Sequence, residues 1–277
     1  MIKLGWFSTG RGAGSRHLLQ TVMEHISKGT LDAELAFVFC NWDNDEEHNP
    51  RKEQRAEFFR LVYSYGIPLV TLSWRRFRPD LWDSDPEAWR NEYGREMRRL
   101  LQPYGFDLGI LAGYMLWVDD ETCSTYNLMN LHPALPDGPK GTWQEVIWQL
   151  MATDAEAHGA MMHLCTPEWD RGEALTYCRF PLRGPGYDEL WDTFRNKLRT
   201  EGLESIKDRE GVDEPLFQRI RADGLRRELP LIVHTIKLFA DGVVRIQDQT
   251  LFAGDSQLDS PYDLSPDIDR SLAEKEF

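Results

Sequence analysis

The amino-acid sequence predicts an α/β fold in which helices cover both faces of an open, mostly parallel sheet. Three observations lead to this class. Over residues 1 to about 120, short apolar runs of strand length alternate with segments whose apolar residues recur at helical spacing. A glycine-rich turn follows the first apolar run, as at a strand-to-helix connection. The hydrophobic content of 41% and the charged content of 28% are typical of a globular chain.

The first half of the chain supplies most of the predicted sheet. Leu18, Leu19 and Val22 recur on one side of the segment after the glycine-rich turn, which predicts a helix. In chain order we expect a strand over 2–7, a helix over 17–27, a strand over 35–40, a helix over 51–65, a strand over 68–72, a helix over 89–101 and a strand over 107–113. This alternation is that of a Rossmann-like sheet, whose ligands lie at the carboxyl ends of the strands.

The second half departs from this regular alternation. A strand is expected to end at His132. The other expected elements are helices over 143–151, 187–199 and 214–225, strands over 160–165, 175–181 and 243–246, and a helix or strand over 232–239. We expect one domain over residues 1–253. Residues 254–277 contain seven acidic and two basic residues, which predicts an acidic tail that is flexible or draped on the surface.

Composition argues against several functional classes. The formal charge of −14 disfavours nucleic acid and anionic membranes as partners. No stretch approaches the roughly 18 apolar residues of a membrane span. The first apolar run is too short for a secretory signal, so we expect a cytoplasmic protein. The four cysteines are widely spaced, which predicts reduced, buried thiols. Most of the ten tryptophans are expected in packing, and some could stack on a planar ligand.

The segment Asn130–Pro133 carries the most specific chemical signal. Asn130 and His132 are two apart at the end of an apolar run, so a strand would present both side chains on one face. Pro133 has no N–H and would end that strand. An amide and an imidazole that point together can stabilise an oxygen that becomes negative during acyl transfer. A capped strand end with a hydrogen-bonded histidine is the structural alternative.

The loop after the first strand, Ser8–Arg16, is a candidate anion site. Its glycines let a ligand approach the backbone, the following helix offers N–H groups, and Arg11 and Arg16 add positive charge. The G-x-G-x-G spacing differs from both the dinucleotide fingerprint and the P-loop, which disfavours a nicotinamide-dependent reductase. A tight turn that binds no ligand is the alternative.

His163 and Asp170 form a second candidate pair, across a predicted turn. A carboxylate at this place can orient an imidazole or accept a proton from a nucleophile. A turn-capping role for Asp170 is the structural alternative. The spacing of His132, His163 and Asp170 is too loose to predict a metal site, and we expect no metal. Gly113, at the end of another strand, would let a ligand lie against the backbone or would mark a plain turn.

Together and in this order, these segments resemble the folate-dependent formyltransferase family, most of all its phosphoribosylglycinamide formyltransferases. The resemblance covers about residues 1–246. It rests on the loop over 8–15, Leu111–Met115, Asn130–Pro136, His163–Gly172 and Phe239–Gly242. It implies the formyltransferase fold, and an enzyme that moves a formyl group from 10-formyltetrahydrofolate to an amine.

The resemblance also implies residue roles. The catalytic residues would be Asn130, His132 and Asp170. Asn130 and His132 would donate hydrogen bonds to the oxyanion, while Asp170 would keep His132 suitably protonated and accept the proton of the amine. The residues that contact the folate would be Leu111, Gly113, Tyr114, Met115, Cys165 and Glu168. The residues that contact the acceptor would be Gly12, Gly14, Ser15, Arg16 and Pro133.

Departures from the family pattern leave the acceptor open. Arg16 stands where the family loop has asparagine, Leu116–Trp117 stands where a basic residue is common, and residues 225–228 do not match an acid of the late helix. We expect a small, phosphorylated amine, by default phosphoribosylglycinamide of purine biosynthesis. The alternatives are another amine such as an amino sugar nucleotide, a formyltetrahydrofolate hydrolase, or a non-catalytic folate- or nucleotide-binding regulator. A homodimer is a further option.

Overall fold

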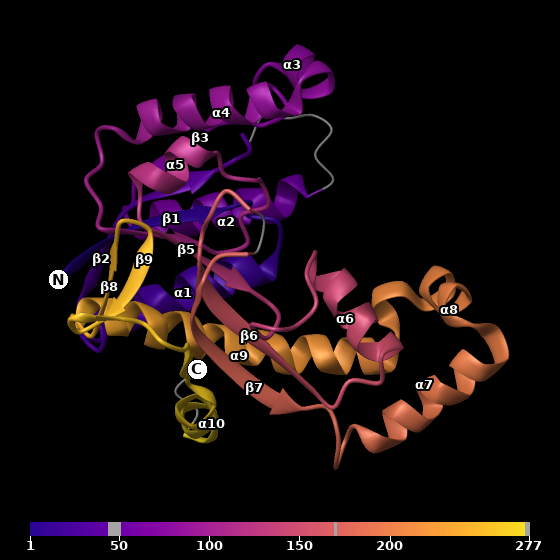
Figure 1. Ribbon diagram of the computed structural model, residues 1–277. Coiled ribbons are helices and arrows are strands. Elements are labelled where there is room, and N and C mark those ends of the chain that lie inside the picture. Colours follow the sequence, from indigo (N-terminus) through magenta and orange to yellow (C-terminus); the bar gives the residue numbers. More distant parts are fainter. Residues whose placement is uncertain (44–50, 169–170, 275–277) are drawn as a thin grey trace. The chain divides into compact units, whose positions relative to one another are not determined.

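The computed structural model describes residues 1–43, 51–168 and 171–274 (Figure 1). Its strands are β1 (Ile2–Ser8), β2 (Ala33–Cys40), β3 (Leu69–Thr71), β4 (Leu108–Leu111), β5 (Leu128–His132), β6 (Ala157–Leu164), β7 (Ala174–Pro181), β8 (Val244–Gln247), β9 (Thr250–Ala253), β10 (Ser256–Gln257) and β11 (Tyr262–Asp263). Its helices are α1 (Ala13–Ser27), α2 (Lys52–Ser64), α3 (Pro79–Ser84), α4 (Pro86–Leu101), α5 (Asp120–Thr125), α6 (Trp143–Ala152), α7 (Asp188–Glu201), α8 (Leu203–Glu210), the 3-10 helix η1 (Gly211–Asp213), α9 (Pro215–Ala240) and α10 (Ser265–Ala273).

The predicted alternation of strands and helices is confirmed from β1 to β4. No expected element corresponds to α3, α5 or α8, because helices of six to eight residues are too short for a periodic apolar pattern. The segment expected as a helix or a strand, 232–239, is part of α9, which continues through Pro230. None of the helices in the described residues is long and apolar enough to span a membrane.

The chain packs as two compact units. The first comprises Met1–Leu131, Met162–Leu175 and Ile232–Ser260, and the second comprises the remaining ranges. In the first unit the strand order is β7-β6-β5-β4-β1-β2-β3, and the pairs β1–β2, β1–β4, β2–β3 and β4–β5 are parallel. In the second unit the order is β11-β7-β6. The predicted fold class, a mostly parallel sheet with flanking helices, is confirmed. One domain was expected over residues 1–253 from the sequence. The last range of the first unit ends at Ser260, and the second unit includes residues from 261 on.

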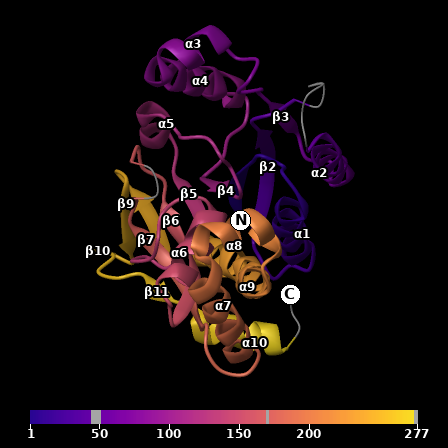
Figure 2. The ribbon, with the colours of Figure 1, turned by 90° about the vertical axis from the view of Figure 1, so that its right-hand side faces the viewer.

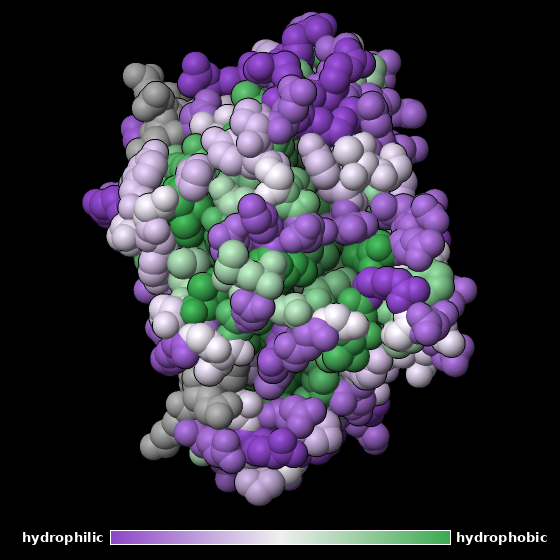
Figure 3. All heavy atoms as spheres, turned by 90° about the vertical axis from the view of Figure 1, so that its left-hand side faces the viewer, coloured by the Kyte–Doolittle hydropathy of each residue, from purple (hydrophilic) through white to green (hydrophobic). Residues whose placement is uncertain are grey.

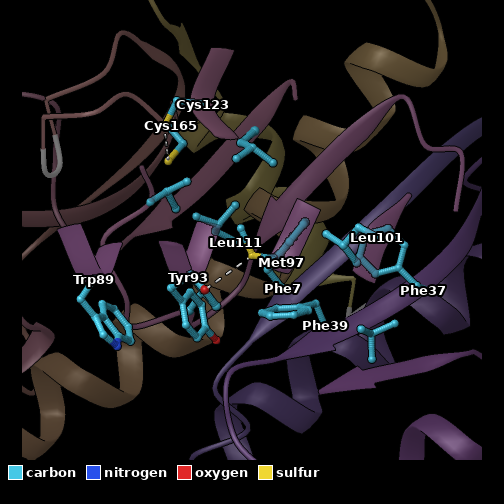
Figure 4. Packing of buried hydrophobic residues seen from close by; sticks show 14 residues of the cluster. Phe7, Phe37, Phe39, Trp89, Tyr93, Met97, Leu101, Leu111, Cys123 and Cys165 are labelled. Carbon is cyan, nitrogen blue, oxygen red and sulfur yellow. Dashed lines mark hydrogen bonds between the residues drawn. The ribbon is translucent and has the colours of Figure 1, made fainter. Parts of the chain in front are cut away.

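The core of the first unit lies between its sheet and α4 with α5. Phe7, Phe37 and Phe39 come from β1 and β2, and they pack with residues of α4 that include Tyr93 and Met97 (Figure 4). Figures 1 and 2 show α4 and α5 on one side of this sheet and α1 and α2 on the other. The upper part of Figure 3, at the height of α3 and α4, is mostly hydrophilic, because α4 is rich in charged residues on its outer side.

The second unit has its own core, and part of the acidic tail belongs to it. Trp191 and Phe194 of α7 pack with Phe217 and Ile220 of α9. In the tail, β11 pairs with β7, the Leu264 N–H donates to a β7 carbonyl, and α10 buries an isoleucine. Of the two expectations for the tail, flexible or draped on the surface, these contacts favour the second for residues up to 274. Charge counting missed the few apolar residues that anchor this segment.

Candidate active site

The loops that follow β1 and β4 are hydrogen-bonded to each other. The Thr9 N–H donates to the Gly113 carbonyl over 3.0 Å, and the Met115 N–H donates to Thr9 Oγ1 over 3.0 Å. Gly10 (φ 63°) and Gly113 (φ 69°) have left-handed backbone, which favours glycine. From α2, the Arg55 Nε–H donates to the Thr9 carbonyl. The loops predicted to hold acceptor and folate thus form one arrangement at the carboxyl edge of parallel strands.

Helix α1 begins directly at the glycine-rich loop. Gly12 is its N-cap residue, and no side chain of the described residues caps this end. Gly14 and Ser15 lie in the first turn, which contains no acidic residue. Burial, and then the charge of Arg51, lower the pKa of Arg11 in this loop. A helix N-terminus of this kind favours a negatively charged ligand.

The Arg16 side chain is directed to α2. Its guanidinium donates to Gln54 Oε1 over 2.8 Å and forms an ion pair with Glu57 at 2.9 Å. These contacts join α1 to α2 and offset the charge that the sequence assigns to the acceptor site. Contact of Arg16 with the acceptor stays a prediction, and it would require the side chain to leave α2.

Three residues predicted to contact the folate have side chains buried in the core of the first unit. Tyr114 is 8% exposed, its hydroxyl donates to the sulfur of Met97 over 3.9 Å, and burial raises the pKa of the phenol. Cys165 is buried with its Sγ 4.0 Å from the Sγ of Cys123, and Leu111 is buried in the same cluster (Figure 4). At these positions only the backbone is placed to line a ligand site.

Trp117 links the two segments that were predicted to hold the folate. It follows the loop after β4, and its indole Nε1–H donates to the Pro167 carbonyl in the loop after β6. Glu168, the next residue, is exposed. Trp117 is itself 48% exposed, and the guanidinium of Arg90 lies 4.4 Å from its ring centre. Sequence reasoning did not assign Trp117 to the site, although the tryptophan count and the departure from the family pattern at Leu116–Trp117 were signals for it.

Asn130 is oriented by His163. Asn130 Nδ2 lies 3.0 Å from His163 Nε2, and His163 Nδ1 lies 2.9 Å from the Leu164 carbonyl oxygen. Because a carbonyl oxygen only accepts, we assign an imidazole proton to Nδ1, so that Nε2 accepts from the Asn130 amide. The sequence marked His163 as the partner of Asp170, whereas its contact with Asn130 is visible only in the structure.

Gly172 allows the chain to pass close to this histidine. A Cβ at Gly172 would lie 1.6 Å from the Leu164 carbonyl oxygen, which is the atom that accepts from His163. The Leu164 N–H donates to the Glu173 carbonyl over 2.9 Å, which holds the two segments together. A side chain at Gly172 would therefore displace the acceptor that orients His163.

His132 is the last residue of β5, two positions after Asn130, and it is buried. Pro133 follows it and is half-buried, and the strand ends there as predicted. Asp170, the third predicted catalytic residue, lies outside the described residues. Among the residues that the structure describes, no group of three or more His, Cys, Asp or Glu side chains could hold a metal ion.

The chain belongs to the formyl transferase family, because the profile of that family matches residues 12–199. Its fold is similar to that of glycinamide ribonucleotide transformylase 1 from Symbiobacterium toebii, with a TM-score of 0.63, 19% identity, and coverage of 92% of this chain and 95% of that chain. It is also similar to the phosphoribosylglycinamide formyltransferase of Coxiella burnetii, with a TM-score of 0.65, 17% identity, and coverage of 95% and 99%.

A formyltetrahydrofolate deformylase from Burkholderia mallei has the same fold, with a TM-score of 0.60, 16% identity, and coverage of 91% of this chain and 70% of that chain. A search of curated proteins found no match. The protein is thus a formyltransferase, and the formyl donor of its family is 10-formyltetrahydrofolate. At these identities the structural likeness shows the fold and does not identify the acceptor.

Proposed function

We propose that this protein transfers the formyl group of 10-formyltetrahydrofolate to the primary amine of a small, phosphorylated acceptor, with phosphoribosylglycinamide as the default acceptor. The observation that carries the proposal is the hydrogen bond between Asn130 and His163 in a chain of this family. This hydrogen bond orients the Asn130 amide on β5, the strand that ends in His132. We further propose that the enzyme acts on small molecules in the cytoplasm.

The chemistry requires hydrogen-bond donors at one oxygen. The lone pair of the amine forms a bond to the formyl carbon, and the formyl oxygen becomes negative. Asn130 Nδ2–H and an N–H of His132 donate to that oxygen, and each such donor is worth about 3 kcal/mol in acyl-transfer sites. As the carbonyl re-forms, the bond to N10 breaks, and N10 takes up a proton in place of the one that the amine has lost, so that tetrahydrofolate leaves. Asp170 accepts the proton that the amine loses, directly or through water.

In this proposal, each substrate binds at loops that follow strands of the sheet. The folate lies along the backbone of Gly113–Met115 and against the loop that contains Pro167 and Glu168. The acceptor phosphate lies at the start of α1, against Gly12, Gly14 and Ser15. The hydrogen bonds of Thr9 to Gly113 and Met115 support this placement, because they join the two loops. Pro133, after His132, borders the acceptor amine.

The direct test is turnover with defined acceptors. The purified protein is incubated with 10-formyltetrahydrofolate and phosphoribosylglycinamide, an amino sugar nucleotide, or no amine, while tetrahydrofolate and formate are measured. We expect tetrahydrofolate release that depends on an amine and yields no formate. Release of formate without an amine would identify a deformylase instead. No turnover with any amine, together with no folate binding by calorimetry, would overturn the proposal.

Two variants test the roles on β5. Asn130→Ala and His132→Ala should each lower kcat by about 100-fold or more, because each removes a donor to the oxyanion. His25→Ala is the control, since His25 lies in the last turn of α1 and bonds to Thr30. An unchanged kcat in either β5 variant would remove that residue from the mechanism.

A further inference from the structure

Two buried cysteines of the first unit are in contact through their sulfur atoms. Cys123 lies on α5, and Cys165 is the first residue after β6. Their Sγ atoms are 4.0 Å apart, and Figure 4 shows the two side chains next to each other. A separation of 42 positions hides this pair in the sequence, which has no C-x-x-C motif. The fold therefore creates a pair of neighbouring thiols that the cysteine spacing did not indicate.

The geometry of the pair suits a disulfide. The sulfur atoms of a disulfide are about 2.05 Å apart, so these two would have to approach by about 2 Å. Rotation of the side chains and a small shift of one segment can supply that approach. The backbone at both positions is tied to the fold, because the Cys123 N–H donates to the Asp119 carbonyl and the Cys165 N–H donates to the Leu128 carbonyl.

Helix α5 is the more firmly held side of the pair. Asp119 is its N-cap residue, and the buried Asp119 carboxylate accepts from the guanidinium of Arg98 over 2.6 Å. On the other side, Cys165 begins the loop in which the Pro167 carbonyl accepts from the indole of Trp117. Closure of the bond should therefore move Cys165 and this loop toward α5, and it should disturb the contact between Trp117 and Pro167.

We propose that Cys123 and Cys165 form a redox-sensitive site, at which a small peroxide converts the two thiols to a disulfide and thereby weakens folate binding. The effect on the folate rests on the proposed function, which places the folate against the loop that contains Pro167 and Glu168. Formation of the disulfide itself depends only on the sulfur pair.

The reaction consumes one peroxide molecule. Cys165 is 8% exposed and Cys123 is 2% exposed, so Cys165 is the thiol that a molecule as small as hydrogen peroxide reaches first. Its sulfur attacks one peroxide oxygen, the O–O bond breaks, and the leaving hydroxide takes up the thiol proton to give water. The Cys123 sulfur then attacks the sulfenic acid sulfur. The S–S bond forms, the S–O bond breaks, and a second water leaves with the Cys123 proton. The two thiols lose two electrons, which reduce the peroxide.

The other two cysteines are suitable controls. Burial raises the pKa of the Cys40 thiol and of the Cys178 thiol to about 12. Such thiols stay protonated at about pH 7.5, and the thiolate is the nucleophile in reactions of this kind. We therefore expect both to react slowly with peroxide.

The test follows the disulfide and the affinity for a folate in the same samples. The purified protein is treated with hydrogen peroxide, and catalase then removes the excess. Peptide mapping without reductant should show residues 123 and 165 linked. Calorimetry with 10-formyl-5,8-dideazafolate, a stable analogue of the donor, should show a Kd about 10-fold higher than in the reduced protein, as for the loss of about one hydrogen bond. Dithiothreitol should reverse both changes.

Two cysteine-to-alanine variants separate the pair from other oxidised groups. Cys123→Ala should bind the analogue as tightly as the reduced wild type, and peroxide should not weaken its binding. Cys178→Ala, a matched change at a buried cysteine of β7, should respond to peroxide as the wild type does.

Three outcomes would overturn the inference. If residues 123 and 165 stay unlinked, the redox site is wrong and the proposed function stands. If the link forms without a change in affinity, or if Cys123→Ala loses as much affinity as the wild type, the pair does not control folate binding. If the reduced wild-type protein does not bind the analogue, the proposed function fails, and the control of folate binding fails with it.

Discussion

Burial of His158 predicts a defined loss of stability in mild acid. His158 lies on β6 in the second unit, and its ring centre is 5.4 Å from that of Phe180. Burial, followed by the charges of Arg221 and His132, lowers its pKa to about 3. In the unfolded chain the imidazole has a pKa of about 6.5. Between these values the unfolded chain binds a proton that the folded protein excludes.

The direction of the effect follows from this difference. The contribution of His158 to the free energy of unfolding is complete above about pH 6.5 and is lost as the pH falls toward about 3. Each pH unit in that window costs about 1.4 kcal/mol, so the full loss is about 5 kcal/mol. Between about pH 7.5 and pH 5 the loss is about 2 kcal/mol, most of it below pH 6.5.

Urea denaturation at about pH 7.5 and pH 5 measures this loss. His158→Gln keeps a polar side chain of similar size and removes the titrating group. We expect the wild-type protein to lose about 2 kcal/mol more than this variant over the interval. His25→Gln, a change at a histidine in the last turn of α1, should lose as much as the wild type. Equal losses in the wild type and His158→Gln would refute the reasoning.

Three further predictions concern the site. His163→Gln should lower kcat by about 10- to 100-fold with little change in the KM for the folate, because the Asn130 amide loses its orienting contact. Steady-state kinetics measures both values, and a change in KM alone would contradict the prediction. Gly172→Ala should lower the free energy of unfolding by about 3 kcal/mol or more, because its Cβ would collide with the Leu164 carbonyl. Gly105→Ala is the control, because its Cβ would meet no atom within 4 Å. In the same denaturant titration its free energy of unfolding should stay within about 0.5 kcal/mol of the wild-type value. Trp117→Phe should raise the KM for the folate about 5-fold by removing the bond to Pro167, and Trp148→Phe in the second unit should leave it unchanged.

Local patterns in the sequence were sufficient for much of the fold. Apolar runs at β1, β2 and β4 and the helical spacing in α1 depend only on near neighbours, so they could be read directly. The short helices left no such pattern. The anchoring of the tail through Leu264 and α10 depends on a partner in β7 that is far away in the chain.

The candidate site shows the same division. The two-residue spacing of Asn130 and His132 was enough to predict that they share one strand, β5, because alternate residues of a strand lie on the same face. The direction of the Arg16 side chain toward α2 could not be read in this way, since it depends on how α1 and α2 pack. The burial of Tyr114 likewise depends on α4, which supplies the sulfur that its hydroxyl contacts.

The sequence by itself determined the parallel α/β architecture, the family, and the strand that ends in His132. The architecture and the strand follow from the period of apolar residues and from residue types at fixed spacing, which are local, and the family follows from the resemblance of the motifs. Only the tertiary structure decided that His163 contacts Asn130, that Trp117 joins the two segments proposed to hold the folate, and that Arg90 lies over its ring. These contacts join residues 27 to 50 positions apart, as in the 50 between Trp117 and Pro167. Strand order and loop conformation bring such residues together, and neither is encoded in spacing along the chain.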